Sequence, residues 1–372
     1  MRTEDLFRHL VEAQGSDLII RTGARPSMRI DGKVRFLSDI PVSPALAQEM
    51  FDRVLDTRQQ EDFFRRGETD SAYDIPGVGR FRVNVFRQRG KLGFVFRHVK
   101  SAIPVLADTG LPVDALTKLC RLKRGLVLVT GTAGSGKSTT LAAMLDWINK
   151  NEQRHVVTLE DPVEFLFEDI KSTFNQREVG VDTMSFAAAL KSVVRQAPDV
   201  IMVGEMRDEE TVAAVLQAAE TGHLVFSTLH TTNAVQTVER VLSFFPPHQH
   251  GLVRMQLSML LEGVVSQRLL PKRDGAGRVA VAEILLATPT VRDLLSEGKT
   301  KELSKAVYEG AEHYGSQTFN QALSKQIKAG KVAVEDALAA SDNPEALKLE
   351  LRGISKGTRV GAGMHDSGGS AY

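Results

Sequence analysis

Residues 131–139 read Gly131-Thr132-Ala133-Gly134-Ser135-Gly136-Lys137-Ser138-Thr139 and follow directly on the apolar, β-branched run Leu126-Val127-Leu128-Val129. The run predicts a buried strand, and the apolar spacing from Leu141 to Ile148 predicts a helix after the loop. A strand, a glycine-rich turn and a helix N-terminus gather several backbone N–H groups around one anion. Lys137 would reach the β- and γ-phosphates, and the Ser138 hydroxyl would bind Mg²⁺. We therefore predict that this loop binds ATP or a related nucleoside triphosphate.

The composition is that of a soluble globular protein with two domains. The chain has 372 residues, of which 42% are hydrophobic and 25% charged, and that length favours more than one core. Its 47 basic and 46 acidic residues leave a formal charge of +1, so no global field favours nucleic acid or an anionic membrane. No apolar stretch is long enough to span a bilayer and the N-terminus is acidic, which predicts a cytoplasmic protein. The single cysteine, Cys120, excludes an internal disulfide and a cysteine-cluster zinc site.

Residues 1–100 predict a small α+β domain that ends in a pair of strands. Gly79–Phe86 alternates strictly, so that apolar side chains share one face while Arg80 and Arg82 share the other. After a turn, the second strand places Arg97 near these two arginines. Two interpretations remain open, since the arginines form either a solvated strand face or a cationic face that meets the nucleotide of a neighbouring subunit.

The rest of the chain predicts a second, larger domain. Residues 101–122 contain proline and glycine breakers and are interpreted as a linker. Strands and helices alternate over residues 123–290, as in a parallel sheet with crossover helices, and this region is interpreted as an ATPase core. Residues 291–352 are helical by periodicity. Residues 353–372 include six glycines and three serines, which predicts a disordered tail.

Acidic residues follow two of the predicted strands of the core. Glu160 and Glu164 lie in a run of three acids just past one strand, and Glu205 follows another. Ligands of open parallel sheets bind beyond the carboxyl ends of the strands, so both groups can converge on the nucleotide. The residue before Glu205 is glycine, where many phosphate-loop enzymes carry a metal-binding aspartate. We therefore assign metal binding to Ser138, Glu160 and Glu164, and activation of water to Glu205.

His230 ends a further strand on the same edge, where its hydrogen bonds could sense the γ-phosphate. A lone histidine is more often structural, and that alternative stays open. A GTPase would carry an Asn-Lys-x-Asp motif, which Asn149-Lys150-Asn151-Glu152 does not match. A small-molecule kinase would not need a separate arginine-bearing domain. A nucleic-acid translocase shares the sheet but is disfavoured by the near-neutral charge and the 6% aromatic content.

Five motifs occur in an order and spacing that are specific when taken together. They are the loop at 131–139, Glu160-Asp161-Pro162-Val163-Glu164-Phe165, Gln176-Arg177-Glu178-Val179, Val203-Gly204-Glu205-Met206-Arg207, and Thr221-Gly222-His223 through His230. Together they resemble the Walker A, Asp box, Walker B and His box of the type IV pilus retraction ATPases, the PilT/PilU family of the secretion ATPase superfamily. Arg80, Arg82 and Arg97 resemble the arginine fingers of that family. Arg195–Met202, Phe244-Phe245-Pro246 and the residues after about 345 resemble the PilU paralogues more than the PilT motors.

The resemblance implies an α/β fold class, with a PAS-like α+β N-terminal domain followed by a RecA-like P-loop ATPase domain and a helical C-terminal region. It also implies a homohexamer that hydrolyses ATP with Mg²⁺ between the two domains. The implied catalytic residues are Lys137, Glu205, His230, Arg80, Arg82 and Arg97.

The resemblance also implies that the ATPase exerts force on an inner-membrane pilus platform protein. The chain would act at the cytoplasmic face of the inner membrane and withdraw pilin indirectly, as an accessory to a main PilT-type retraction ATPase and without nucleic acid. A nucleotide-binding adaptor that does not hydrolyse ATP remains the alternative.

Overall fold

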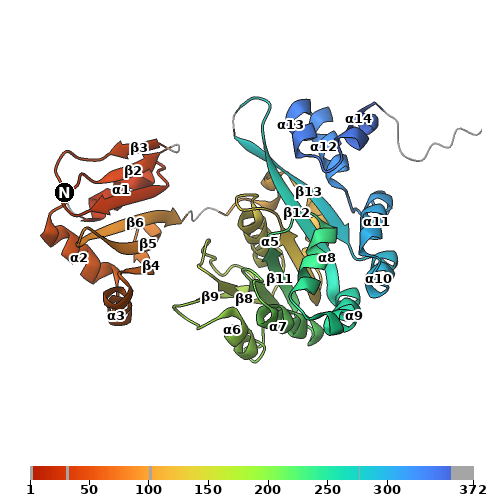
Figure 1. Cartoon of the computed structure of the whole chain (residues 1–372), viewed down its shortest axis with the longest axis horizontal. Helices are drawn as coiled ribbons and strands as arrows, with labels where there is room; N and C mark the ends of the chain where they lie inside the picture. Colours follow the sequence, from red (N-terminus) through yellow and green to blue (C-terminus); the bar gives the residue numbers. More distant parts are fainter. Residues whose placement is uncertain (1–2, 31–32, 100–102, 276, 353–372) are drawn as a thin grey trace, which may run out of the picture. The chain divides into compact units, whose positions relative to one another are not determined.

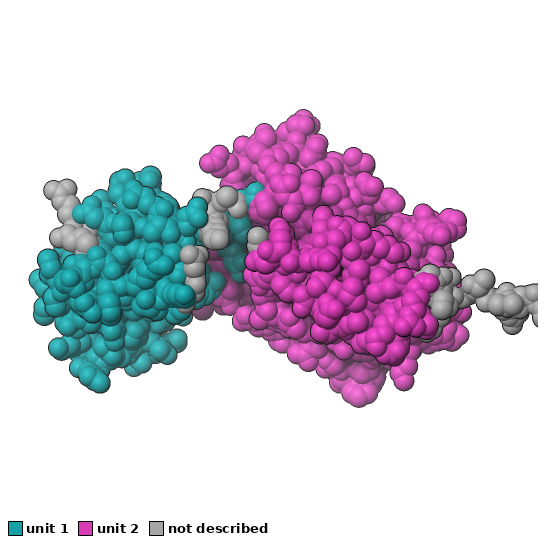
Figure 2. Space-filling model, turned by 90° about the horizontal axis from the view of Figure 1, so that it is seen from above, with its two compact units in different colours: residues 1–103, 164–166 teal, residues 104–163, 167–372 magenta. Residues whose placement is uncertain are grey.

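A computed structural model describes residues 3–30, 33–99, 103–275 and 277–352. Contacts divide the chain into two compact units (Figure 2), of which unit 1 comprises residues 1–103 and 164–166 and unit 2 the remainder. The predicted disordered tail at 353–372 lies outside the described residues. No helix within the described ranges combines the length and the apolar composition that a bilayer crossing needs.

Unit 1 is built on a six-stranded antiparallel sheet in the order β3-β2-β1-β6-β5-β4 (Figure 1). Its strands are β1 (Asp17–Arg21), β2 (Ser27–Ile30), β3 (Lys33–Phe36), β4 (Glu68–Ile75), β5 (Gly79–Gln88) and β6 (Lys91–Val99). Its helices are α1 (Thr3–Glu12), α2 (Pro44–Val54) and α3 (Thr57–Arg66). All three helices contribute apolar side chains to one core, in which the ring of Phe7 lies 4.7 Å from those of Phe81 and Phe96. The helices therefore cover one face of this sheet.

The hairpin of β5 and β6 confirms the predicted alternation. Phe81, Val83 and Val85 are buried, whereas Arg80 and Arg82 are partly exposed. Because side chains of a strand alternate between faces, the arginines lie on the face opposite the core.

Unit 2 contains a seven-stranded sheet in the order β13-β12-β7-β11-β10-β8-β9, in which only the β12–β13 pair is antiparallel. Its strands are β7 (Gly125–Thr130), β8 (His155–Glu160), β9 (Thr173–Glu178), β10 (Val200–Val203), β11 (Leu224–Leu229), β12 (Leu261–Pro271) and β13 (Arg278–Leu286). Its first helices are η1 (Leu106–Thr109), α4 (Val113–Cys120), α5 (Lys137–Asn151), α6 (Phe186–Val193), α7 (Glu209–Glu220), α8 (Ala234–Ser243), η2 (Pro247–Gln249) and α9 (His250–Leu260). The α/β fold with crossover helices is therefore confirmed.

Both faces of the central part of this sheet are buried, because successive residues of strands such as β7 and β10 belong to different cores. Leu126 and Leu128 of β7 pack with α6 to α9 on one face, and Val127 and Val129 pack with α4 and α5 on the other. The segment interpreted as a linker contributes η1 and α4 to this second core, and Cys120 is buried there. The main-chain division falls at residues 103 and 104.

The C-terminal region is helical, as predicted. Its helices are α10 (Pro289–Ser296), η3 (Thr300–Glu302), α11 (Leu303–Glu309), α12 (Phe319–Lys328), α13 (Val334–Ala340) and α14 (Pro344–Leu351). Helices α12 to α14 form a separate small core with Leu270 of β12 and with Val279 and Val281 of β13. The end of the β12–β13 ribbon thus carries the last three helices of the described chain.

Candidate functional site

The loop between β7 and α5 adopts a conformation that requires its glycines. Gly131 has φ of 147° and Gly136, the residue before α5, has φ of 95°, a region that L side chains rarely adopt. A Cβ atom at Gly131 would lie 2.4 Å from Ser135 Oγ and 2.6 Å from the carbonyl oxygen of Gln267. The Ser135 hydroxyl is buried without a hydrogen-bond partner among the described residues. A narrow, glycine-lined loop at a helix N-terminus fits a phosphate group.

Lys137 begins α5 and its side chain lies against this loop. Its Nζ donates hydrogen bonds to the carbonyl oxygens of Gly131, at 2.8 Å, and Thr132, at 3.1 Å. The same Nζ lies 3.5 Å from Nδ1 of His230. The ammonium group is therefore placed between the loop and the end of β11.

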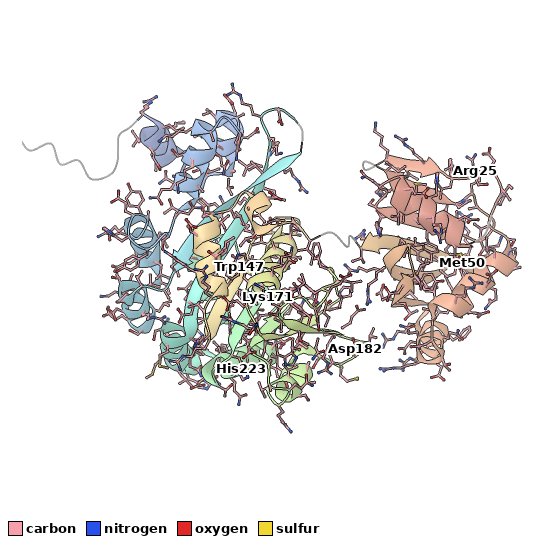
Figure 3. All side chains as sticks on the ribbon, turned by 180° about the vertical axis from the view of Figure 1, so that it is seen from behind. Arg25, Met50, Trp147, Lys171, Asp182 and His223 are labelled. Atoms are coloured by element: carbon pink, nitrogen blue, oxygen red, sulfur yellow. The ribbon has the colours of Figure 1, made fainter. Side chains whose placement is uncertain are left out.

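Glu205 and His230 meet at the carboxyl edge of the sheet. His230 directly follows β11, Glu205 lies two residues after β10, and these strands are parallel neighbours. Nε2 of His230 lies 3.4 Å from Oε1 of Glu205. The structure thus brings Lys137, His230 and Glu205 together from three separate parts of the sequence. His223, by contrast, precedes β11 (Figure 3), and its Nδ1 lies 2.9 Å from the carbonyl oxygen of Ala218.

Arg207 is a site residue to which the sequence assigned no role. Its Nη2 lies 2.9 Å from Oε2 of Glu205, and its Nη1 lies 3.5 Å from Oδ2 of Asp161. Burial acts to raise the pKa of Glu205, but the hydrogen bond and charge of Arg207, together with His230, outweigh it and lower the pKa. Glu205 is therefore ionised at neutral pH. Arg207 belongs to the Val203–Arg207 motif, but its place in an irregular segment gave no periodicity from which this contact could be predicted.

The proposed metal ligands lie in different surroundings. Glu160 ends β8, is buried, and accepts hydrogen bonds from Thr158 Oγ1 at 2.7 Å and Gln176 Nε2 at 3.2 Å. Glu164 groups with unit 1, whereas Ser138 and Glu160 belong to unit 2. Among the described residues, no three His, Cys, Asp or Glu side chains are arranged to hold a metal ion. Mg²⁺ in nucleotide sites takes one or two protein ligands plus phosphate and water oxygens, so the assignment of Ser138, Glu160 and Glu164 stays a prediction.

The three arginines of unit 1 differ in their local partners. Arg80 Nη1 lies 3.0 Å from Asp74, and Arg97 Nε lies 2.9 Å from Asp17. Arg82 stands directly opposite Arg97 in the β5–β6 register, and it has no ion-pair partner in the part of the chain that the structure describes. A role for Arg80, Arg82 and Arg97 as fingers stays a prediction.

Fold and site together define a class of protein. A parallel sheet carries a phosphate loop after β7, a carboxylate after β10 and a histidine after β11, all on one edge. This is the arrangement of a P-loop nucleoside triphosphatase, in which a lysine faces the phosphates and an acid faces the attacking water.

Comparison with known proteins identifies the family. The model of the type II/IV secretion system protein family matches residues 106–339. The type IV pilus ATPase PilU of Pseudomonas aeruginosa is 44% identical over 95% of this chain and 92% of its own length. The retraction ATPase PilT of the same organism is 42% identical over 93% of this chain and 99% of its own length. A crystal structure of the pilus retraction motor PilT with bound ADP superposes with a TM-score of 0.87, at 43% identity, and covers 94% of this chain and 99% of that one.

The chain belongs to the PilT/PilU family of type IV pilus ATPases. The predicted family, the predicted fold and the prediction of an ATPase are therefore confirmed, and the assignment of nucleotide binding to residues 131–139 stays a prediction. The identities to PilU and PilT are 44% and 42%, so identity alone does not separate an accessory from a main motor.

Proposed function

We propose that this chain is a homohexameric motor that hydrolyses ATP with Mg²⁺ to power retraction of type IV pili. The observation that carries the proposal is the chain of contacts from Lys137 through His230 to Glu205, in which successive side-chain atoms lie 3.5 and 3.4 Å apart. A phosphate-facing cation and a water-facing carboxylate are both needed for phosphoryl transfer to water. A protein that only bound nucleotide would need the first and not the second.

Each residue of the site has a distinct part in this proposal. The backbone of residues 131–136 and the Lys137 ammonium bind the β- and γ-phosphates, and Glu205 orients the attacking water and accepts its proton. His230 donates a hydrogen bond toward the γ-phosphate and links its state to Glu205. Ser138, with support from Glu160 and Glu164, would hold Mg²⁺, which would neutralise charge on the phosphate oxygens.

Arg82 is the strongest candidate for a finger among the three arginines. It faces Arg97 across the hairpin, and like charges directly opposite each other on two strands are destabilising. Asp17 compensates Arg97 at 2.9 Å, whereas Arg82 has no such partner in the described ranges. In the proposed ring, Arg82 meets the charge of a bound nucleotide, with Arg80 and Arg97 beside it.

The proposed ring acts on the pilus through partner proteins. We propose that it acts at the cytoplasmic face of the inner membrane on a pilus platform protein, and through it on pilin. The likeness of Arg195–Met202 and of the C-terminal region to PilU paralogues favours an accessory that assists a main PilT-type ATPase.

Two experiments test the proposal. Phosphate release by the purified protein should require Mg²⁺ and should disappear in Lys137→Ala, whereas a non-hydrolysing adaptor would release none under any condition. Pilus retraction in cells that lack the main motor then separates an autonomous motor from an accessory, for which we expect no retraction. Stimulation of phosphate release by single-stranded DNA would instead favour a nucleic-acid translocase.

A further inference from the structure

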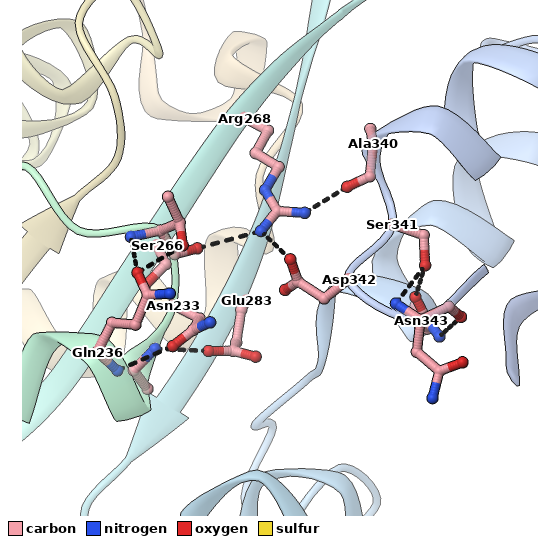
Figure 4. A network of polar contacts seen from close by, with 12 residues as sticks. Asn233, Gln236, Ser266, Arg268, Glu283, Ala340, Ser341, Asp342 and Asn343 are labelled. Atoms are coloured by element: carbon pink, nitrogen blue, oxygen red, sulfur yellow. Dashed lines mark hydrogen bonds and ion pairs between the residues drawn. The ribbon is translucent and has the colours of Figure 1, made fainter.

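Arg268 of β12 lies where three parts of unit 2 meet (Figure 4). Its Nη2 lies 2.6 Å from Oδ1 of Asp342 and donates to the carbonyl oxygen of Thr232 at 3.3 Å. Its Nη1 donates to the carbonyl oxygen of Ala340. The guanidinium also stacks on the ring of Phe319, with 3.9 Å from Cζ to the centroid. One side chain thus joins a strand of the ATPase sheet, the α13–α14 junction and the segment that follows His230.

The contact at Thr232 is close to the catalytic edge in the sequence and in space. Thr232 lies two residues after His230, whose ring is within 3.5 Å of both Lys137 and Glu205. Glu283 of β13 also contacts this segment, because its carboxylate accepts a hydrogen bond from the Ala234 N–H at 2.7 Å. Gln236 Oε1 also accepts hydrogen bonds from the Thr232 N–H at 3.3 Å and from its hydroxyl at 2.7 Å. Arg268 and Glu283 therefore add contacts from β12 and β13 to a segment that α8 also holds.

The other end of the guanidinium is fixed by the C-terminal helices. Asp342 follows α13, and the neighbouring Ser341 Oγ donates to Asn320 Oδ1 of α12 at 2.7 Å. Phe319 is buried in the small core of α12 to α14. Because a planar guanidinium with several donors keeps a fixed geometry when it is held at both ends, a displacement of the α13–α14 junction would be transmitted to Thr232.

We propose that Arg268 is a positioning residue that couples the α13–α14 junction to His230 and so makes ATP turnover depend on the docking of the C-terminal helices. The inference rests on the proposed hydrolysis of ATP. It concerns the placement of a group that acts on phosphate, and misplacement of such groups lowers the rate of the chemical step more than it lowers binding.

Two variants separate positioning from stability alone. Arg268→Ala removes the bond to Thr232, and we expect kcat to fall about tenfold with KM changed less than about twofold. Arg154→Ala removes another arginine of unit 2, which donates to the carbonyl oxygens of Leu122 at 2.6 Å and Arg121 at 3.1 Å, and should leave kcat within about twofold at a temperature well below its Tm. Asp342→Asn should give an intermediate loss, while Glu345→Gln, an exposed change on α14, should give none. Equal kcat losses in Arg268→Ala and Arg154→Ala, or no loss in Arg268→Ala, would overturn the proposal.

A second measurement does not depend on hydrolysis. Hydrogen–deuterium exchange of residues 229–236 should be faster in Arg268→Ala than in the wild type, and unchanged in Arg154→Ala. If the wild type releases no phosphate, the proposed function is wrong. The exchange experiment still tests whether Arg268 is coupled to residues 229–236. If the wild type is active and exchange in Arg268→Ala is unchanged, only the coupling fails.

Discussion

The two sheets of the molecule place their charged side chains in different ways. The antiparallel sheet of unit 1 has helices on one face, so Arg80 and Arg82 project from the middle of a strand on the other face. The parallel sheet of unit 2 is buried on both faces, and its reactive side chains, such as Glu205 and His230, follow the strand ends. A sheet covered on both sides concentrates its chemistry on an edge, whereas a half-covered sheet presents charges along a face.

We infer from this difference that the two units have different roles in catalysis. Lys137 lies 3.5 Å from His230, and His230 lies 3.4 Å from Glu205, inside one unit, and we propose that these residues form the water-activating part of the site. Of the three arginines of unit 1, Arg80 pairs with Asp74 and Arg97 with Asp17, whereas Arg82 has no ion-pair partner among the described residues. We therefore expect the parallel edge to do the chemistry and the arginine face to complete it in an assembled ring.

The largest expected effect comes from the arginine face. An arginine finger is worth about 10³–10⁵ in rate because the guanidinium meets charge that develops on the transferring phosphoryl group. Arg82→Ala should lose turnover on that scale while the protein still folds and forms rings, and Arg35→Ala, an exposed arginine on β3, should behave as wild type. Phosphate release and size-exclusion chromatography measure the two properties.

Mixed rings sharpen this test. After dissociation and reassociation, rings that contain both Arg82→Ala and Glu205→Gln subunits should regain some activity if the arginine acts across a subunit boundary. Background activity at every mixing ratio would leave only a structural role for the arginine face.

The parallel edge should separate binding from chemistry. Loss of a general base costs about 10²–10⁴ in rate, so Glu205→Gln should lose turnover but keep nucleotide affinity, whereas Lys137→Ala should lose both. Fluorescence titration measures affinity, and Lys150→Ala, at the far end of α5, is the control. Normal hydrolysis by Glu205→Gln would remove the carboxylate from the mechanism.

The variant Arg207→Ala tests whether a neighbouring residue at the carboxyl edge of the sheet sets the protonation state of Glu205. Without Arg207, only His230 opposes the effect of burial on Glu205, so the pKa of Glu205 should rise from the lowered value that it has in the wild type. The acid limb of the kcat profile of Arg207→Ala should therefore move to higher pH, and turnover should be lost earlier as pH falls. A profile that coincides with the wild type on both sides of pH 4.5, the ordinary pKa of a glutamate, would contradict this.

Glu283 is an exception to the pattern, since it is a carboxylate buried within β13, the antiparallel edge strand of the sheet in unit 2. Burial raises its pKa from 4.5 to about 7, against the hydrogen bond from Ala234. The folded protein then binds the proton more tightly than the unfolded chain, so stability is lost as pH rises from about 4.5 to 7.

The neutral variant Glu283→Gln should recover this loss. Its advantage over the wild type in urea unfolding should grow between pH 5 and 8, by at most on the order of 3 kcal/mol, while exposed Glu345→Gln should show no such gain. A constant difference across the pH range would mean that Glu283 remains ionised.

The residues that meet at the parallel edge could be predicted because they follow strand ends. Apolar runs reveal buried strands, and the carboxyl ends of parallel strands share an edge, so Lys137, Glu205 and His230 were expected near one nucleotide. The β5–β6 hairpin was predictable for a similar reason, since strict alternation indicates one buried face. In both cases the pattern of apolar residues located the strand, and the strand determined where the neighbouring polar side chains lie.

Other features carry no such period. β9 consists of Thr173–Glu178, whose polar residues sit on an edge strand and give little apolar signal. α4 lies in a segment whose prolines and glycines indicated a linker, yet its apolar face joins the second core of unit 2. Arg207 and Arg268 act through contacts with residues on other segments, which depend on tertiary packing and leave no trace in the local pattern.

Three successive residues of β12 each attach to a different element. Ser266 Oγ lies 2.8 Å from Thr130 Oγ1 at the end of β7, Gln267 Nε2 donates to Thr140 Oγ1 of α5 at 2.8 Å, and Arg268 reaches Asp342. A substitution at one of them leaves the other two attachments in place. Removal of a single residue earlier in the strand would shift all three and turn each side chain to the opposite face. β12 should therefore accept exchanges of residue type far more readily than changes of length.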